Sequence, residues 1–523
     1  MNFPVWDVAF GAGLLMALVA GLHVFVSHFA VGGGLFLVLT EHKARWSQDA
    51  ELLGWLKKHT KFFVLVTVVF GAVSGVGIWF TIGLISPTAT SNLIHIWVWG
   101  WAIEWVFFFL EITAALLYLY GWEKLEPRVH LWFGWIYFIT AFLSLVVING
   151  IITFMLTPGH WIENHEFWSG FFNPTYMPSL LFRTCTALAL AGIYALITAS
   201  VQKDAALKAR IVRWGALWTV PSLLLLPVCA WWYIQKIPPE LWSSARGAMP
   251  TGTYSALLAC VLLGVTLLLA LLALVRPGRL HLAFSLVVLL VAFSAMDSFE
   301  FVRESVRKPY VIENYLYANS VYAAAMPGDG GFTVDKIADA GVLKTARWVS
   351  NRVLTPANQV AAGKEIFRVE CASCHTASSY RGVRQYIAMR QWDRDKIRAM
   401  VGSLYLMHNG VMPPFAGTDA EQDALTAYLS SLQSAPAAAA AADGKTVYEH
   451  DCGMCHQMLR DDHLFANMPR DPQAAADALK DLPGMFPVMP DLKLTEGERR
   501  ALVQWVNAER PNLPAGPAAK GGK

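Results

Sequence analysis

The chain has 523 residues, of which 55% are hydrophobic and only 15% are charged, and its mean hydropathy is +0.42. About a quarter of the residues in a soluble domain are charged, so this composition indicates a membrane protein and excludes a disordered, collagen-like or small disulfide-rich chain. The net charge of +3 is too small to indicate a nucleic-acid partner, and we expect none. Residues 1–299 contain long apolar runs, whereas residues 300–523 contain most of the polar sequence.

Apolar stretches of about 20 residues, enough to cross a bilayer as a helix, recur through the first part of the chain. They lie near residues 8–40, 62–86, 95–121, 131–156, 179–201, 212–234, 253–275 and 280–299. We expect no cleavable signal peptide, because residues 1–13 contain Asp7 and no Lys or Arg. The sequence therefore predicts an all-α membrane domain of about eight helices over residues 1–300.

Basic residues mark alternate loops of this domain. The segments after the first, third, fifth and seventh spans carry Lys43, Arg45, Lys57, Lys58, Lys61, Lys124, Arg128, Lys203, Lys208, Arg210, Arg213, Arg276 and Arg279. The N-terminus and the remaining loops carry only Lys236 and Arg246. The positive-inside rule therefore predicts a multi-pass protein of the cytoplasmic membrane with its N-terminus outside. An even number of spans returns the chain to the periplasmic side at residue 300.

The seven cysteines fall into two groups. Three lie inside apolar spans and are expected to be small core residues: Cys185, Cys229 and Cys260. The other four form two Cys-x-x-Cys-His motifs: Cys371, Cys374 and His375, then Cys452, Cys455 and His456. This spacing is typical of covalent c-type haem attachment, in which two thiols bind the haem vinyl groups and the histidine is an axial ligand of the iron. A disulfide is one alternative, and a zinc site is another, although zinc would need a second ligand pair that neither module has.

The second axial ligand of each haem is expected downstream of the motif. Met412 precedes two prolines and Met489 precedes one, and a methionine in a loop stiffened by proline suits iron ligation. Either methionine could instead be a packing residue. The rival candidates are Met407 and His408 in the first module and Met485 in the second.

The polar half divides at an alanine-rich stretch that is typical of a linker. We predict an extracytoplasmic connector at 301–355, haem modules at 356–434 and 443–510, a linker at 435–442 and a disordered tail at 511–523. Each module has a Gly-Lys pair that opens a helix, a haem motif, a Met-Pro loop and a last helix with an aromatic residue. The modules therefore resemble small, all-helical class I cytochrome c domains.

Ionisable residues inside membrane spans are costly and indicate function by default. Glu104 and Glu111 are seven residues apart and so share one helix face. At 1.5 Å per residue, His23 and Glu104 both lie about 15–20 Å from the outer surface and could meet on one cofactor. Such an arrangement suits a b-type haem, and the alternative is that His23 is a hydrogen-bonded structural residue. Arg183, Asp297 and Glu300 lie near the outer ends of their spans, whereas His95, His130 and His281 are expected at the membrane interface.

The membrane half resembles cytochrome bd oxidase subunit I. The resemblance rests on Gly21–Val26 around His23, on Ala102–Leu125 around Glu104 and Glu111, on Asn149–Pro158 and on Phe301–Tyr310. It implies that His23 ligates a haem of the oxygen-reducing site, that the two glutamates serve this haem and its proton path, and that Asp297 takes the place of a carboxylate haem ligand. It also implies a second membrane subunit, and a homo-oligomer is the alternative.

Several family features are missing from this chain. Arg183 stands where the family has a histidine ligand of its low-spin haem b, and the methionine partner of that haem maps onto apolar residues near Leu257. The quinol-binding loop is reduced to about residues 234–252, and the family's subunit has nine helices. The resemblance therefore implies a divergent member in which a dihaem cytochrome c replaces quinol as the immediate electron source.

These observations predict a respiratory haem oxidoreductase with two covalent c haems and one or more non-covalent haems b or d. Electrons would pass between the c haems and a buried centre that reduces O₂, or another small oxidant such as NO, with a soluble cytochrome as redox partner and lipid around the helices. Arg183 would neutralise a haem propionate or contact a carboxylate, unless it is an interfacial residue. The alternative is a quinol dehydrogenase that sends electrons outward through the c haems. A non-enzymatic anchor ranks last, because it would leave three buried ionisable groups unused.

Overall fold

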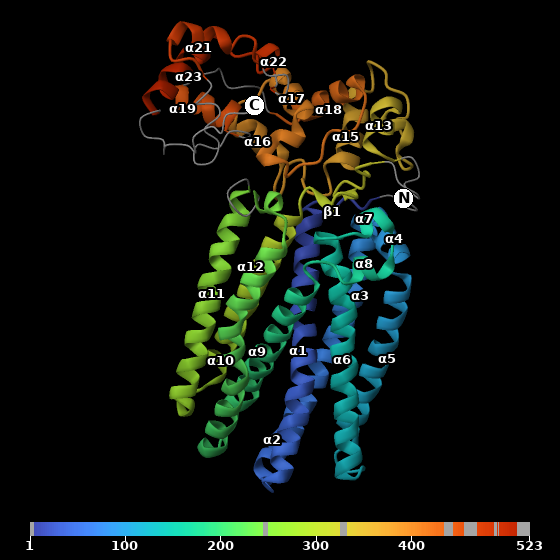
Figure 1. Ribbon diagram of the computed structural model, residues 1–523, viewed down its shortest axis with the longest axis vertical. Helices are drawn as coiled ribbons and strands as arrows, with labels where there is room; N and C mark the ends of the chain where they lie inside the picture. Colours follow the sequence, from blue (N-terminus) through green and yellow to red (C-terminus); the bar gives the residue numbers. More distant parts are fainter. Residues whose placement is uncertain are drawn as a thin grey trace. The chain divides into compact units, whose positions relative to one another are not determined.

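The computed structural model describes residues 5–243, 249–324, 332–433, 443–453, 468–485, 489 and 491–509 (Figure 1). The predicted linker at 435–442, the predicted tail at 511–523 and the haem-motif residues Cys455 and His456 lie outside this described part. The chain forms two compact units. One contains residues 15–307 and 311–314, and the other contains residues 1–14, 308–310 and 315–523.

The first unit is a bundle of long helices that run side by side (Figure 1). Its helices are α1 (Ala12–Trp46), α2 (Ala50–Val64), η1 (Leu65–Gly71), α3 (Ala72–Ile85), α4 (Pro87–Ile96), α5 (Val98–Gly121), α6 (Pro127–Leu156), α7 (Trp161–Asn164), α8 (Phe167–Phe171), α9 (Tyr176–Ser200), α10 (Ala205–Lys236), η2 (Pro239–Ser243), α11 (Pro250–Val275), η4 (Pro277–Arg279) and α12 (Leu282–Arg307). Within the described residues, eight helices are long and apolar enough to cross a membrane, with α2, η1 and α3 forming one of them. This confirms the predicted all-α bundle and a multi-pass membrane protein.

Small residues on α1 allow close contact with its neighbours. A Cβ atom added at Gly32 would lie 1.9 Å from the carbonyl oxygen of Ala187 on α9, and one at Gly34 would lie 2.4 Å from the ring of Tyr137 on α6. Both distances are far below van der Waals contact, so only glycine fits at these positions. Helix α1, which carries His23, is therefore packed between α6 and α9.

Two details of the membrane bundle differ from expectation. The segment between the first two spans, which the spacing predicted as a loop, is helical except for the turn at residues 47–49. The last helix is longer than predicted and continues to Arg307. Ion pairs three residues apart, Arg303 with Glu300 and Arg307 with Glu304, support this polar extension.

The second unit carries the two haem motifs. Its elements are β1 (Tyr310–Ile312), β2 (Leu316–Tyr317), α13 (Val334–Ala340), α14 (Val342–Thr345), α15 (Gln359–Glu370), α16 (Val383–Met389), α17 (Arg394–Gly402), η5 (Leu404–Asn409), α18 (Asp419–Ser431), α19 (Gly444–Val447), η6 (Tyr448–Cys452), α21 (Pro472–Ala478), α22 (Leu482–Met485) and α23 (Glu496–Glu509). The two short strands pair with each other and form the only sheet in the described part of the chain.

The same helix crossing occurs in both haem modules. A Cβ atom added at Gly363 would lie 2.0 Å from the carbonyl oxygen of Ala424, so α15 touches the backbone of α18. Gly444 is in the same relation to Ala501, again at 2.0 Å, where α19 crosses α23. The aromatic residues Tyr428 and Trp505 flank the two contacts. The repeat seen in the sequence is therefore a repeat of packing.

The predicted connector packs onto the first haem module. Its residues Ile337, Val342 and Leu343 are buried in the same hydrophobic core as helices α15 and α18. The carboxylate of Glu421 on α18 accepts hydrogen bonds from the backbone N–H groups of Val342 (2.9 Å) and Leu343 (2.8 Å). These two N–H groups begin α14, so α18 caps this helix of the connector.

Candidate haem sites

The first haem motif lies where helix α15 ends. The backbone N–H groups of Cys374 and His375 both donate to the carbonyl oxygen of Cys371, at 3.1 and 2.9 Å, so the motif folds into one tight turn. This turn places the two thiols and the imidazole close together, as attachment of one haem requires.

The hydrogen bond of His375 prepares its ring for iron. Its Nδ1 atom lies 3.3 Å from the carbonyl oxygen of Arg381. A carbonyl oxygen can only accept, so Nδ1 must carry the proton and Nε2 of the neutral ring keeps its lone pair. A histidine held in this way by its other nitrogen is typical of metal ligation. The residues therefore fit a haem whose iron is bound by Nε2.

The candidate axial methionines of the first module have different surroundings. Met407 is 2% exposed and belongs to the hydrophobic core, whereas Met412 is half-buried at the edge of that core. The side chain of His408 lies outside the described residues. A ligand must leave its sulfur free to face the haem, so this difference favours Met412 over Met407 as the axial ligand.

The second motif is described only in part. Cys452 ends the π-helix η6 and is buried, and its neighbour Asp451 is buried as well. Met489 is half-buried and packs against the core, while the side chain of Met485 lies outside the described part. The choice between Met489 and Met485 stays a prediction.

Sequence reasoning missed a buried carboxyl group next to each haem motif. Glu370 directly precedes Cys371 and accepts a hydrogen bond from the amide of Asn319 (2.7 Å). Burial raises the pKa of Glu370 to about 8. In the second module, Asp451 directly precedes Cys452 and pairs with Lys396, whose Nζ atom lies 3.0 Å from the carboxylate. The common position of the two carboxyl groups could have been noticed in the sequence, but their burial could not.

In the membrane unit, His23 faces the helix formed by η1 and α3. Its Nδ1 atom lies 3.2 Å from the carbonyl oxygen of Gly71, the last residue of the π-helical segment η1, and 3.2 Å from the hydroxyl of Ser74. The carbonyl again requires a proton on Nδ1, so the neutral ring keeps the Nε2 lone pair. A Cβ atom added at Gly75 would lie 3.0 Å from the imidazole ring, so this glycine gives the ring its space. These features fit a haem ligand.

The two glutamates of α5 both face α6. Ser144 donates its hydroxyl to Glu104 (3.0 Å), and Tyr137 donates to Glu111 (3.1 Å). The two partners on α6 are seven residues apart, as are the two glutamates, so the pairs follow one line along the helix interface. The hydrogen bonds of His23 and Glu104 go to different helices.

Arg183 lies inside the bundle and contacts a carboxylate. It is 6% exposed, and its Nη2 atom lies 3.5 Å from Glu300 on α12. Glu300 also pairs with Arg303 at 2.7 Å. Asp297, one turn earlier on α12, packs against the backbone of Gly21, two residues before His23. The expected outer cluster therefore contains an ion-pair network that joins α9 to α12.

One polar cluster in the membrane unit was not predicted from the sequence. His130, expected at the membrane interface, is fully buried and lies 2.9 Å from the carboxylate of Glu41, which is also fully buried. Tyr118 and Arg45 donate to the same carboxylate, each at 2.7 Å. Glu41, just beyond the predicted end of the first span, provides His130 with a buried partner near the start of α6. His95 and His281 are exposed.

Comparisons with known proteins agree with this division of the chain. Residues 12–237 match the family model of cytochrome bd terminal oxidase subunit I. Residues 358–429 and 439–506 match the family model of the cbb3-type cytochrome c oxidase subunit III. The first match covers helices α1 to α10, and the second covers both Cys-x-x-Cys-His motifs.

The solved structures that match this chain include a bd oxidase. The bd oxidase from Geobacillus thermodenitrificans is 15% identical, and the alignment covers 59% of this chain and 89% of that chain with a TM-score of 0.49. A search of curated proteins found no match.

Proposed function

We propose that this chain, a bd oxidase-like membrane protein fused to cytochrome c domains, passes electrons from its two c haems to a buried haem b or d beside His23 and there reduces O₂. Four electrons and four protons reduce one O₂ to two water molecules, so the site needs both an electron entry and a proton supply. NO is a second candidate oxidant of the same kind.

The observation that carries this proposal is the hydrogen bond made by Nδ1 of His23. Because Nδ1 donates to Gly71, Nε2 is available in the membrane interior for a haem iron. The haem would supply the iron at which O₂ is bound and reduced.

The two glutamates would supply protons to this site. Glu111 shares a hydrogen bond with Tyr137. Glu104, about two helical turns closer to the outer surface, shares one with Ser144. Both carboxyl groups can hold a proton, and the hydroxyl partners can pass one on. We infer that protons move past Glu111 toward Glu104.

Arg183 is the reason to favour c haems over quinol as the electron source. It occupies the position at which the resemblance expects a haem-ligating histidine, and it pairs with Glu300 instead. A guanidinium stays protonated and cannot ligate iron. We therefore infer that no low-spin haem b is bound there and that electrons enter through the c haems.

The orientation follows from the loop charges. We propose that the N-terminus and both haem modules are periplasmic, where a soluble cytochrome would deliver electrons. Large apolar side chains on the outer face of α5, including Trp99, Trp105 and Phe109, are exposed in the single chain. They would contact lipid, a second membrane subunit or another copy of the chain.

The test combines haem analysis with oxygen uptake. Pyridine haemochrome spectra of the purified protein should contain a b- or d-type component besides haem c, and reduced cytochrome c should support O₂ consumption better than quinol does. A spectrum with haem c alone would refute the buried centre. Quinol-driven reduction of an external cytochrome, without O₂ uptake, would support the reverse direction instead.

A further inference from the structure

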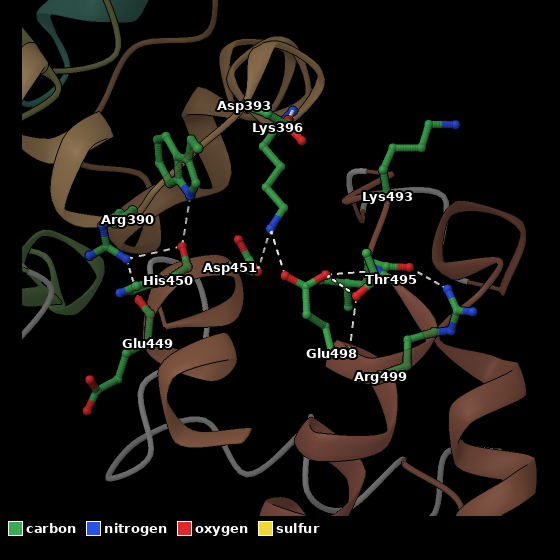
Figure 2. Close-up of polar contacts among 12 residues, drawn as sticks. Arg390, Asp393, Lys396, Glu449, His450, Asp451, Lys493, Thr495, Glu498 and Arg499 are labelled. Carbon is green, nitrogen blue, oxygen red and sulfur yellow. Dashed lines mark hydrogen bonds and ion pairs between the residues drawn. The ribbon is translucent and has the colours of Figure 1, made fainter. Parts of the chain in front are cut away.

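The first haem module forms hydrogen bonds with the residues that directly precede the second haem motif (Figure 2). Trp392 donates its indole N–H to the carbonyl oxygen of His450 (3.0 Å). Arg390 donates to the carbonyl oxygens of Glu449 and His450. These carbonyls belong to the last turn of η6, where a helix has no internal donors left, so the first module satisfies them.

Lys396 completes this contact with a buried charge. Its side chain is 10% exposed and crosses from α17 to Asp451, whose side chain is 2% exposed, with 3.0 Å between Nζ and the carboxylate. A second carboxylate, Glu498 of α23, lies 3.8 Å from the same Nζ atom (Figure 2). A buried lysine that lost these partners would be strongly disfavoured. Burial of Lys396 in the first module therefore depends on the two carboxylates of the second module.

The position of Asp451 connects this ion pair to the haem. Asp451 directly precedes Cys452 in the chain, and Cys452 is the first cysteine of the second haem motif. A buried carboxylate next to a haem stabilises ferric over ferrous iron, because the ferric centre carries one more positive charge. A lysine cation beside the carboxylate offsets that effect. Burial and local charge are among the factors by which a protein sets a haem potential.

We propose that Lys396 is a positioning residue for the second haem: it fixes the second module against the first and holds the reduction potential of the second haem above the value that Asp451 alone would give. Reduction of this haem adds one electron to its iron, Fe³⁺ to Fe²⁺, and breaks no bond. The inference concerns the c haems only and is independent of the direction of electron flow. An oxidase activity could therefore be absent without affecting it.

The test is a redox titration of the c haems in the full-length protein, followed by visible absorbance. In Lys396→Met, one of the two c components should become at least tenfold harder to reduce, which corresponds to about 59 mV or more for one electron. The other component should stay unchanged. Lys396→Arg, which keeps the charge, should lie near the wild type.

A double variant separates charge from folding. Lys396→Met combined with Asp451→Asn removes both charges, and its potentials should return toward those of the wild type. The matched control is Arg398→Met on the same helix, because Arg398 pairs with Asp423 at the exposed surface and should not affect either potential.

The proposal is wrong if Lys396→Met leaves both potentials unchanged, if Arg398→Met has the same effect, or if the double variant keeps the full shift. If Lys396→Met fails to fold, the single variant Asp451→Asn still tests the proposal. It removes the carboxylate next to Cys452, leaves the lysine cation paired with Glu498 alone and should raise the potential of one c haem, whereas an unchanged potential would overturn the inference.

Discussion

Two histidines in different units have the same hydrogen-bond arrangement. His23 and His375 each donate Nδ1–H to a backbone carbonyl oxygen, of Gly71 and of Arg381 respectively. In both, the backbone sets the tautomer and leaves Nε2 to bind iron. The motif Cys-x-x-Cys-His predicted this role for His375, whereas for His23 the role was predicted from its depth in an apolar span and from the resemblance to cytochrome bd oxidase subunit I.

The first prediction concerns His23. Replacement by alanine removes the only imidazole proposed to bind the buried haem, so His23→Ala should lose the b- or d-type absorbance and keep the full haem c content. The control His95→Ala changes an exposed histidine on α4 and should keep every haem. Survival of the non-c haem in His23→Ala would show that another residue is the ligand.

A second prediction uses the carboxyl group of Glu370. Its pKa of about 8 in the folded protein lies above the ordinary value of 4.5, because burial disfavours the charged form. The folded state thus keeps a proton that the unfolded chain has lost. Its contribution to stability is complete below pH 4.5, falls as the pH rises to about 8 and is constant above that.

Glu370→Gln should therefore reduce the pH dependence of the thermal midpoint of the first haem module between pH 5 and pH 8. The measurement is the loss of c-haem ellipticity on heating, with the exposed Glu496→Gln as the control. An unchanged pH profile in Glu370→Gln would mean that Glu370 is ionised in the folded protein.

The buried cluster of Glu41, Tyr118 and His130 shows where residue-level prediction fails. Each of these residues looks like part of a loop or a span end when taken alone. Their burial depends on the approach of α1, α5 and α6, which no local pattern specifies. A carboxylate with several donors is stable there, although an unpaired one would be costly.

Helix number was predictable, whereas helix ends were not. A run of about 20 apolar residues identifies a span locally, and all eight predicted spans correspond to helices. The polar ends of α2 and α12 were missed because their stability comes from partners. His59 on α2, for example, lies 2.9 Å from the hydroxyl of Thr198 on α9.

The third prediction tests the repeated helix crossing. Gly444→Val would place side-chain atoms against the carbonyl oxygen of Ala501, and such overpacking costs about 1–3 kcal/mol or more. The second module should then fold poorly and bind less haem, so that covalent haem per chain falls by up to about half. The measurement is haem c per chain.

The control for this change is Gly497→Val at the start of the opposing helix α23, where a Cβ atom would meet no atom within 4 Å. This variant should keep the haem content of the wild type. Equal losses in the two variants would show that valine is disfavoured for a reason other than the crossing.

At the scale of the whole molecule, two kinds of haem site are joined in one chain. The cytochrome c modules contain the two Cys-x-x-Cys-His motifs, and the membrane bundle contains His23 and a line of carboxyl groups on α5. The burial of Arg183 at the position of the haem-ligating histidine is consistent with electrons moving inward, whereas the contact around Lys396 is compatible with either direction of flow. The order of these parts was readable from the sequence, because motifs and apolar runs are local.

The direct test is to mix the fully reduced protein rapidly with O₂, without any quinone, and to follow the c haems by absorbance. The account predicts that both c haems become oxidised within a single turnover, and that His23→Ala, which lacks the buried haem, keeps them reduced. If the c haems of the wild type stay reduced in O₂ until a quinone or an external cytochrome is added, the proposed direction of electron flow is contradicted.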